Sequence, residues 1–296
     1  MNSTATLIPV SVIVMTKNEE RNIGKCVEAL RGFAEIFVVD SGSTDQTRAI
    51  ARGLGAIVVD FEWNGRYPKK KQWCLENLPF SHDWALYVDA DEEMTPQLAE
   101  EIRSRLAAGT EHAGYFVAYD YVFLGRILRH GRRVVKLVLL DRHRARFPVQ
   151  DDLQATNMWE VEGHVQPVVS GPTRALRLRM IHHDHDSLFA YFDRHNRYSD
   201  WEAVVRQTGS LDETQPSVRR LMKVVFNVLP FKGIVAFVYF FLARGGFMDG
   251  RPGFHFAVAS AFYYWQVSAK TYEGRLASVR GDSLTSKASQ APSRPD

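Results

Sequence analysis

The chain has 296 residues, of which 45% are hydrophobic and 24% are charged. This length supports one large domain or two ordinary ones, and the composition excludes a small disulfide-dense scaffold, wholesale disorder and a polytopic membrane protein. The 37 Lys and Arg residues exceed the 34 Asp and Glu residues by only three, so a nucleic acid is not the expected partner. The two cysteines, Cys26 and Cys74, are expected to be reduced thiols of a cytoplasmic protein.

Apolar runs alternate with helical patterns over the first hundred residues. Strands are predicted over residues 10–15, 35–40, 56–61 and 84–90, and helices over 19–30, 45–53, 68–78 and 96–106. This alternation is typical of βαβ units and predicts an α/β fold with a mainly parallel sheet flanked by helices. Three strands end in an acidic residue, Asp40, Asp60 or Asp89, at the edge where open α/β sheets bind ligands.

The pattern changes after this half. Short aromatic and β-branched runs over residues 115–140 predict further strands, some of them antiparallel. Residues 188–207 have aromatic side chains at helical spacing behind a capping Ser187, which indicates an amphipathic helix. We therefore expect a globular domain over residues 1–215.

Two apolar runs follow. Residues 224–243 are nearly all apolar but include Asn227, Pro230 and Lys232, and the run at 254–267 has 14 residues, too few for a straight bilayer-spanning helix. Interfacial or re-entrant docking fits both runs, and a buried helical hairpin is the alternative. We expect a helical membrane-associated region over 216–273 and a disordered tail rich in Ser, Arg and Pro over 274–296.

The charge is unevenly distributed along the chain. Residues 216–296 contain 11 Lys and Arg against 4 Asp and Glu, a balance of +7, whereas the preceding residues contain 26 against 30, a balance of −4. Basic charge around apolar runs suits anionic lipid at a cytoplasmic surface. We therefore expect the protein at the cytoplasmic face of the inner membrane, held peripherally or by a re-entrant segment.

An acidic cluster follows the fourth predicted strand. Asp89, Ala90 and Asp91 form a D-x-D sequence, and Glu92 and Glu93 come next. Two carboxylates on such a turn can share Mg²⁺ or Mn²⁺ and leave positions open for phosphate oxygens. A solvated acidic turn is the alternative, and the place after a βαβ strand favours the metal site.

Polar side chains also follow the first two strands, where Thr16, Lys17, Asn18 and Glu19 come after the first and Asp40 and Ser41 after the second. Adjacent strand ends form a crevice whose amide, hydroxyl and carboxylate groups can bind a nucleobase and a ribose, although such residues also serve as helix caps. Of the three lysines at 69–71, Lys71 is predicted to reach a phosphate, and the other two fit a solvated face.

Together these segments resemble the ordered motifs of family 2 glycosyltransferases, which have the GT-A fold. Within that family the similarity is greatest to lipopolysaccharide-core β-glucosyltransferases, and it extends over roughly residues 10–273. The matching segments are Thr16-Lys17-Asn18-Glu19-Glu20, Val39-Asp40-Ser41-Gly42-Ser43-Thr44-Asp45, Lys71-Gln72-Trp73 and Asp89-Ala90-Asp91-Glu92.

The resemblance implies a nucleotide-diphospho-sugar transferase with a donor half over residues 8–110 and an acceptor half over 111–215. It implies inverting, metal-dependent transfer, usually from a UDP-sugar, to a hydroxyl of a lipid-linked or lipopolysaccharide-type saccharide of the cell envelope. By position, the nucleoside contacts would be Lys17, Asn18, Asp40 and Ser41. Lys71 would lie near the diphosphate, and Asp91 would bind the metal with Asp89 assisting.

Inverting transfer also needs a base for the acceptor hydroxyl. Family members often have a Val-His-Glu sequence in the acceptor half, and aligning it on His164 leaves Val165 where the Glu is expected. We therefore predict Glu162 as general base with His164 beside it. His164 itself, Glu160 and the Asp151-Asp152 pair are the alternatives.

A histidine-rich segment, His182-His183-Asp184-His185-Asp186, has the composition of a zinc site. The resemblance implies one His here and no metal, so we expect a loop that lines the acceptor cleft. Two other functions remain open at this point. One is a polyprenyl-phosphate glycosyltransferase, whose acceptor needs little base catalysis, and the other is a noncatalytic membrane-surface adaptor with the same fold.

Overall fold

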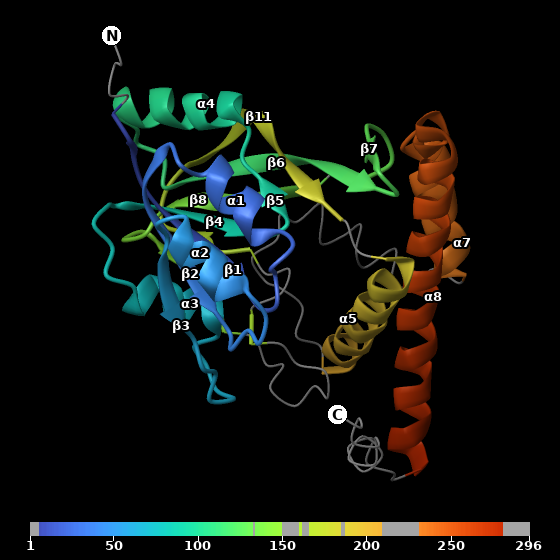
Figure 1. The fold of residues 1–296 in the computed structure, drawn as a ribbon. Helices are drawn as coiled ribbons and strands as arrows, with labels where there is room; N and C mark the ends of the chain where they lie inside the picture. The colour runs from blue at the N-terminus through green and yellow to red at the C-terminus, as the bar shows by residue number, and fades with distance from the viewer. Residues whose placement is uncertain are drawn as a thin grey trace. The chain divides into compact units, whose positions relative to one another are not determined.

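The structure is a computed structural model that describes residues 6–132, 134–149, 160–161, 166–184, 187–208 and 231–280 (Figure 1). The chain divides into two compact units. The first comprises Met1–Pro148 and Glu160–His185, and the second comprises Val149–Trp159 and Asp186–Asp296. The predicted boundary at residue 215 stays a prediction, because residues 209–230 lie outside the described part of the chain.

A mixed sheet forms the centre of the first unit. Its strand order is β3-β2-β1-β4-β8-β6-β11-β5, with β7 paired to β6, while β9 and β10 pair separately. The strands are β1 (Ile8–Thr16), β2 (Phe33–Asp40), β3 (Ile57–Asp60), β4 (Trp84–Asp89), β5 (Glu92–Glu93), β6 (Gly114–Phe123), β7 (Arg126–Leu128), β8 (Val134–Asp141), β9 (Ala145–Arg146), β10 (Val168–Val169) and β11 (Thr173–His183).

Strand direction follows the two halves that the sequence predicts. The strands β1 to β4 are parallel, as βαβ connections require. The strand β8 is antiparallel to both β4 and β6, and β11 is parallel to β6. The expected GT-A-like α/β fold with a mixed sheet flanked by helices is confirmed at this level, but the sheet is less parallel than predicted, because β5, β7 and β8 all pair antiparallel.

Four helices belong to the first unit: α1 (Ile23–Ala29), α2 (Thr47–Gly53), α3 (Lys70–Asn77) and α4 (Pro96–Ala107). The last of these begins with Pro at its first position, and the Thr95 side chain accepts a hydrogen bond from the Leu98 amide at 3.2 Å. Buried side chains of β1, β2 and β4, such as Val12, Phe37 and Leu86, form the core against these helices.

The first helix starts later than the sequence predicts. We expected it from Glu19, but α1 begins at Ile23, and Asn18 adopts a left-handed backbone conformation with φ of 57°. The amides of Asn18 and Glu19 donate to the hydroxyls of Ser43 and Thr47, at 2.8 and 2.7 Å. These side chains replace the hydrogen bonds of a first helical turn, so the segment after β1 is a loop that is tied to the loop after β2.

Helices make up the described part of the second unit. They are α5 (Leu188–Thr208), α7 (Lys232–Phe237), the π-helical segment η1 (Val238–Ala243), the 3₁₀ segment η2 (Gly246–Asp249) and α8 (Gly250–Arg280). The predicted cap of α5 is present, since the Ala190 amide donates to the Ser187 hydroxyl at 3.2 Å. Polar contacts join α5 to α8, including a hydrogen bond from the Tyr263 hydroxyl to Glu202.

The apolar C-terminal sequence is bent. Among the described helices none is both long and apolar enough to cross a membrane by itself, but Lys232–Ala243 and Gly246–Ser278 meet the criterion together across a bend of 71°. The helix α8 continues to Arg280, beyond the point at which the sequence suggests a tail. Asn227 and Pro230 lie outside the described residues, and the predicted membrane segment stays a prediction.

Candidate active site

Predicted site residues align at the carboxyl edge of the parallel strands. In the sheet register Thr16 lies opposite Asp40, Asp40 lies opposite Asp60, and Met15 lies opposite Asp89. The loops after β1, β2 and β4 therefore start at the same level. This is the edge at which α/β sheets of this kind bind ligands.

Asp40 is held by the loop residues around it. Its side chain is fully buried and accepts hydrogen bonds from the Thr16 hydroxyl at 3.0 Å, the Ser43 amide at 2.8 Å and the Ser43 hydroxyl. Burial alone would raise the pKa of Asp40, but these hydrogen bonds and the nearby Arg48 lower it below its ordinary value. Asp40 is therefore an ionised carboxylate that organises the loop after β2.

Two of the predicted nucleoside residues are exposed beside it. Lys17 and Asn18 lie at the surface of the loop after β1, and the Asn18 side-chain oxygen accepts from the Thr44 amide at 2.9 Å. Glu19 accepts a hydrogen bond from the Asn22 side chain at 2.9 Å. Part of the polar pattern in this segment therefore fixes the loop, while Lys17 and Asn18 are exposed to solvent at the carboxyl edge of the sheet.

A buried lysine reaches the same edge. The Lys70 Nζ donates to the Thr16 carbonyl oxygen at 3.2 Å and to the Ser41 hydroxyl, and it lies 3.8 Å from Glu160 Oε1. Its side chain is almost completely buried, and burial lowers the pKa of Lys70, although the Glu160 charge opposes the shift. The Lys70 amide also donates to the Glu160 carbonyl oxygen at 2.8 Å, so the residue is fixed at both ends.

Lys71, the residue that the sequence singled out, lies elsewhere. Its Nζ is 5.8 Å from the centre of the Phe147 ring, and its carbonyl oxygen accepts from the Tyr87 hydroxyl at 2.7 Å. The charge of Lys71 acts on Asp89 and contributes to lowering the pKa of that residue. Lys70 and Lys71 thus act on different parts of the edge, and a diphosphate contact of Lys71 stays a prediction.

Asp89 is paired with a lysine from a neighbouring strand. The Nζ atom of Lys136 on β8 lies 2.7 Å from Asp89 Oδ2 and 2.6 Å from Glu92 Oε1. Removal from water by itself raises the pKa of Asp89, but the charges of Lys136 and Lys71 outweigh that effect and lower it. Glu92 is buried, and its side chain accepts a hydrogen bond from the Asp89 amide at 3.0 Å, which holds the turn between the two residues.

Asp91 faces a histidine instead. The Nε2 atom of His182 on β11 lies 3.6 Å from Asp91 Oδ2, and the His183 amide donates to the Asp91 carbonyl oxygen at 2.8 Å. Loss of water raises the pKa of Asp91 to about 7; the His182 charge opposes this shift, and the carboxylates of Asp89 and Glu92 add to it. A cation bound here would offset these negative charges.

A divalent cation such as Mg²⁺ or Mn²⁺ needs several oxygen or nitrogen ligands. Within the described ranges no group of three or more His, Cys, Asp or Glu side chains forms a complete metal cage. Asp91 and His182 supply one carboxylate and one imidazole on one side, which fits Mg²⁺ or Mn²⁺ if phosphate oxygens fill other positions. Because Asp89 already pairs with Lys136, Asp91 is better suited than Asp89 to bind a cation.

His182 is fixed by its neighbours in the sheet. It lies opposite Tyr121 on β6 and opposite Glu92 on β5, and its ring stacks on Tyr121 with a centroid distance of 5.1 Å and an interplanar angle of 15°. The Tyr121 hydroxyl donates to Asp184. His183 pairs with Glu93 at 2.6 Å, so the described residues of the histidine-rich segment are bound to carboxylates and rings.

The predicted catalytic base cannot be placed. Glu162, His164, Val165 and the pair Asp151-Asp152 lie outside the described residues. Of the carboxylates that the sequence offers for this role, Glu160 is described, and its Oε1 atom lies 3.8 Å from Lys70 Nζ.

Sequence comparison settles the family. The profile of Glycosyl transferase family 2 matches residues 11–183, more than half of the chain, from within β1 to the end of β11. The chain belongs to glycosyl transferase family 2.

The relatives of this glycosyltransferase include one whose name refers to lipopolysaccharide core biosynthesis. A lipopolysaccharide core biosynthesis glycosyltransferase, LpsC of Rhizobium meliloti, is 29% identical over 92% of this chain and 95% of that protein. An uncharacterized glycosyltransferase of Rickettsia conorii is 37% identical over 39% of each chain. Among solved structures, glucosyl-3-phosphoglycerate synthase from Mycobacterium tuberculosis with Mn²⁺ and UDP is 19% identical, with a TM-score of 0.40, over 69% of this chain and 81% of that chain.

Three residues at the carboxyl edge of the sheet could not be assigned correctly from the sequence. Lys70 was assigned to a solvated face, but it is buried against Ser41. Lys136 lies 47 positions from Asp89 in the chain, and no local pattern connects them. His182 is expected from the sequence in a loop that lines the acceptor cleft, but it lies near the end of β11, where it pairs with Asp91.

Proposed function

We propose that this glycosyltransferase transfers a sugar, with inversion, from a nucleotide sugar to a hydroxyl of a membrane-associated saccharide in cell-envelope or lipopolysaccharide synthesis. A UDP-sugar is the proposed donor. The observation that carries the proposal is the pairing of Asp91 with His182, 3.6 Å apart, on the sheet edge that also holds Asp40 and Ser41. This pair suits a divalent cation that would bind the phosphates of the donor.

The donor site follows from the contacts at the strand ends. Lys17, Asn18, Asp40 and Ser41 are proposed to bind the nucleoside, and Thr16 and Lys70 hold Asp40 and Ser41 in position. Because Lys70 fixes the Ser41 hydroxyl and Thr16 fixes the Asp40 carboxylate, both polar groups are oriented before the donor arrives. Preorganisation of this kind lowers the entropy lost on binding.

Asp91 and His182 are proposed to hold Mg²⁺ or Mn²⁺. When bound, the ion would neutralise the charge that develops on the departing diphosphate. Asp89 ends β4, and the charges of Lys136 on β8 and Lys71 on α3 lower its pKa and keep it ionised. Asp89 is thus suited to accept hydrogen bonds from donor hydroxyls, and Lys71 to contact phosphate. Glu162, with His164, is proposed to take the proton of the acceptor hydroxyl.

The donor and metal proposal is tested by UDP release from a panel of nucleotide sugars, with membranes as the acceptor source and with or without EDTA. EDTA should abolish release, and Mn²⁺ or Mg²⁺ should restore it. Asp91→Asn should lose at least about tenfold in metal affinity, because a ligand charge is removed. The matched change Asp83→Asn, at an exposed carboxylate paired with His143, should not alter metal affinity. Metal-independent release with every donor would refute the proposal.

The base and the acceptor are tested separately. Glu162→Gln and His164→Gln should abolish transfer to a hydroxyl while UDP binding persists. A polyprenyl-phosphate glycosyltransferase would tolerate both changes, because a phosphate acceptor is already ionised. Activity that survives both changes would therefore favour the polyprenyl-phosphate alternative.

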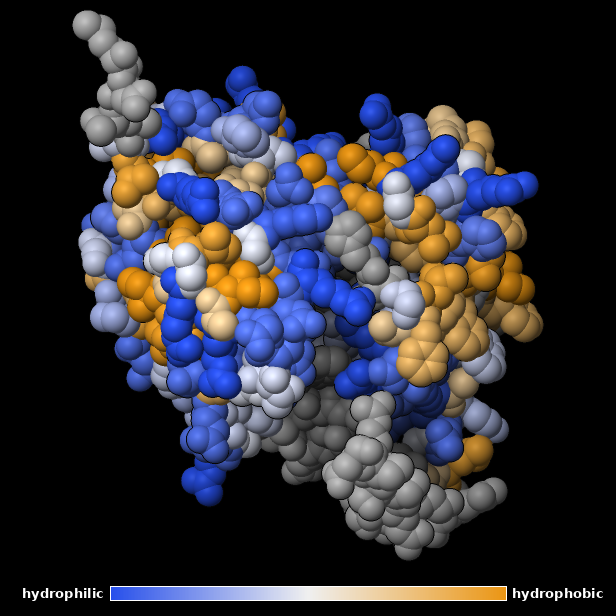
Figure 2. Space-filling view, viewed as in Figure 1, coloured by the Kyte–Doolittle hydropathy of each residue, from blue (hydrophilic) through white to orange (hydrophobic). Residues whose placement is uncertain are grey.

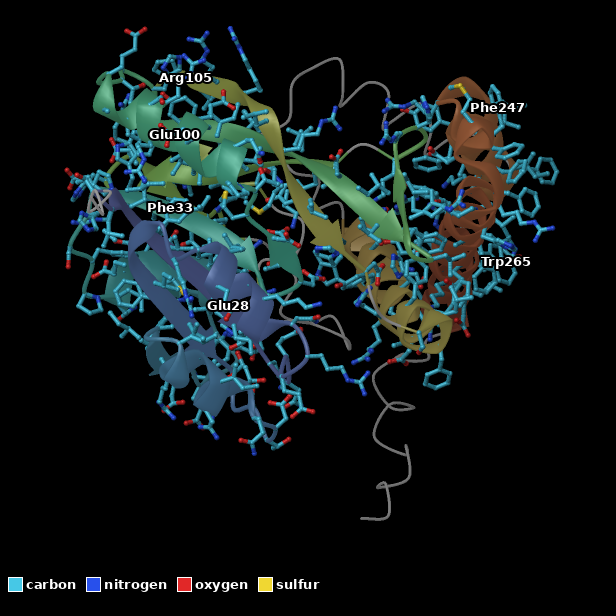
Figure 3. The ribbon with its side chains drawn as sticks, turned by 45° about the horizontal axis from the view of Figure 1, so that its top comes forward. Glu28, Phe33, Glu100, Arg105, Phe247 and Trp265 are labelled. Carbon is cyan, nitrogen blue, oxygen red and sulfur yellow. The ribbon has the colours of Figure 1, made fainter. Side chains whose placement is uncertain are left out.

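A membrane location is supported by exposed apolar side chains of the second unit. Figure 2 shows hydrophobic residues gathered where Figure 1 draws α7 and α8. Phe247 is 53% exposed and Trp265 is 57% exposed, and both are labelled in Figure 3. The other exposed large apolar residues of this region are Phe231, Ile234, Val238, Tyr239, Leu242, Met248, Phe254, Val258, Phe262, Tyr272 and Leu276.

We propose that this apolar region rests in the cytoplasmic face of the inner membrane, peripherally or as a re-entrant segment. Exposed patches of this extent mark interaction surfaces, and aromatic and basic side chains suit the membrane interface. Phe247→Asp with Trp265→Asp should lower the bound fraction on vesicles of phosphatidylglycerol and phosphatidylcholine. Leu7→Asp, at a residue that is 50% exposed in the first unit, is the control. Equal vesicle binding by all three proteins would contradict the membrane proposal.

A further inference from the structure

Glu160 belongs to the acceptor half of the sequence but contacts the donor half. Its Oε1 atom lies 3.8 Å from Lys70 Nζ, and its carbonyl oxygen accepts a hydrogen bond from the Lys70 amide at 2.8 Å. Both residues belong to the first unit, so the contact lies within one compact body. Glu160 therefore holds Lys70 both at its backbone and at its side chain.

The ammonium group of Lys70 connects Glu160 to the ends of two strands. It donates to the carbonyl oxygen of Thr16, the last residue of β1, and to the hydroxyl of Ser41, which follows β2. Burial disfavours the charged form of this lysine and lowers the pKa of Lys70. Among the charges that oppose this shift, that of Glu160 has the largest effect. Glu160 therefore helps to keep Lys70 charged while Lys70 binds Ser41.

A second contact ties the acceptor half to the start of α3. The Phe147 amide donates a hydrogen bond to the Gln72 side-chain oxygen at 2.7 Å. Gln72 and Lys70 both lie in the first turn of α3, and they bind Phe147 and Glu160 respectively. The start of this helix therefore fixes the chain of the acceptor half at two points, and through Lys70 one of these points is connected to Ser41.

We propose that Glu160 is a positioning residue for the donor, which acts through Lys70 to orient the Ser41 hydroxyl toward the nucleoside. A general base must lie within hydrogen-bond reach of the acceptor hydroxyl, whereas Glu160 faces the lysine that binds Ser41. The inference rests on the proposed function, in which Ser41 binds the nucleoside, and it adds a residue of the acceptor half to the donor site. Donor affinity thus depends on a contact between the two halves.

The test is calorimetric titration of the full chain and its variants with UDP and Mn²⁺, after circular dichroism has shown that each variant is folded. E160Q should weaken UDP binding about fivefold, because a partly exposed ion pair is lost while the backbone hydrogen bond remains. E160D keeps the charge and should recover part of this loss. The control E100Q removes a carboxylate that pairs with Arg103 on α4 and is labelled in Figure 3, and it should bind UDP as the unaltered chain does.

A double-mutant cycle determines whether Glu160 acts through Lys70. K70M/E160Q should bind UDP as weakly as K70M, because Glu160 has no effect once the lysine is absent. Additive losses, or an E160D protein that binds UDP no better than E160Q, would overturn the proposal.

The remaining outcomes separate this role from the other functions of the site. Unchanged UDP affinity in E160Q would overturn the proposal, and loss of transfer in that same protein would assign Glu160 as the general base instead. The unaltered chain reports on the proposed function itself. If it does not bind UDP, the proposed donor is refuted, whereas equal binding by the unaltered chain and E160Q refutes only the role of Glu160.

Discussion

Lys136 Nζ lies 2.7 Å from Asp89 Oδ2, across the boundary between the parallel and antiparallel parts of the sheet. The pair joins the acidic turn after β4 to the strand β8, and the same ammonium contacts the buried Glu92. It follows that Lys136 has two effects at once. It compensates two carboxylates, and it leaves Asp91 as the carboxylate that is available to a cation.

Lys136→Met should therefore lower the free energy of unfolding by about 2 kcal/mol, since the lysine's hydrogen bonds to charged groups are lost. Glu92 would remain buried without its cation. The measurement is chemical denaturation of the full chain followed by circular dichroism. Lys25→Met, at an exposed position on α1, should change stability by less than about 0.5 kcal/mol. A Lys136→Met protein as stable as the Lys25→Met protein would contradict this role.

The second prediction concerns Lys70 and its neighbour Lys69, both of which are buried. Lys70 fixes Ser41 and contacts Glu160, whereas the Lys69 ammonium lies 5.5 Å from the centre of the Tyr67 ring. Lys70→Met should weaken UDP binding about tenfold, because the Ser41 hydroxyl loses the group that orients it. Lys69→Met should leave UDP affinity unchanged in the same calorimetric titration. Equal losses for the two variants would mean that general destabilisation, not the Ser41 contact, is responsible.

The order of strands and helices in the first unit can be predicted from local sequence, because each buried strand is a continuous apolar run. The runs that end in Asp40, Asp60 and Asp89 predict both the parallel half of the sheet and the edge at which these carboxylates meet. The start of α1 could not be predicted in the same way. Its first expected turn is replaced by hydrogen bonds that the Asn18 and Glu19 amides donate to the hydroxyls of Ser43 and Thr47, more than twenty positions away in the chain.

Some site residues also could not be predicted from sequence patterns, because their contacts join residues that are far apart in the chain. Lys70 and Lys71 are adjacent and chemically identical, and only the packing of α3 decides which of them enters the core. His182 meets Asp91 because β11 pairs with β5, a two-residue strand that has no sequence signal of its own. Local chemistry thus indicates the kind of site, and the sheet register determines which residues complete it.

Acid titration should expose the role of Asp40. Burial alone would raise the pKa of Asp40, but hydrogen bonds from Ser43 and Thr16 and the charge of Arg48 lower it in the folded chain. A carboxyl whose folded pKa is depressed adds stability above its unfolded value of about 3.9, and that stability is lost as the pH falls through the folded pKa. Asp40→Asn should therefore cost most near neutral pH and progressively less in acid.

The measurement is the free energy of unfolding of both proteins across this pH range. Ser43→Ala, which removes one donor to Asp40, should show a smaller difference with the same pH trend. A difference between Asp40→Asn and the unaltered chain that stays constant from neutral to acid pH would argue against the charge as its cause.

The close packing of η2 against the start of α8 should depend on a glycine in the first turn of α8. A Cβ atom built on Gly253 would lie 2.0 Å from the carbonyl oxygen of Gly246 and 2.8 Å from Cβ of Asp249, much closer than real contacts permit. Because the nearest atom belongs to the backbone, side-chain rotation cannot relieve the clash. Gly253→Ala should destabilise the second unit by about 2 kcal/mol, as overpacking does elsewhere. Gly32→Ala is the control, since a Cβ there would meet nothing within 4 Å. Hydrogen exchange of the α8 amides should accelerate in Gly253→Ala alone, whereas protection equal to that of Gly32→Ala would show that the packing of η2 against α8 does not need the glycine.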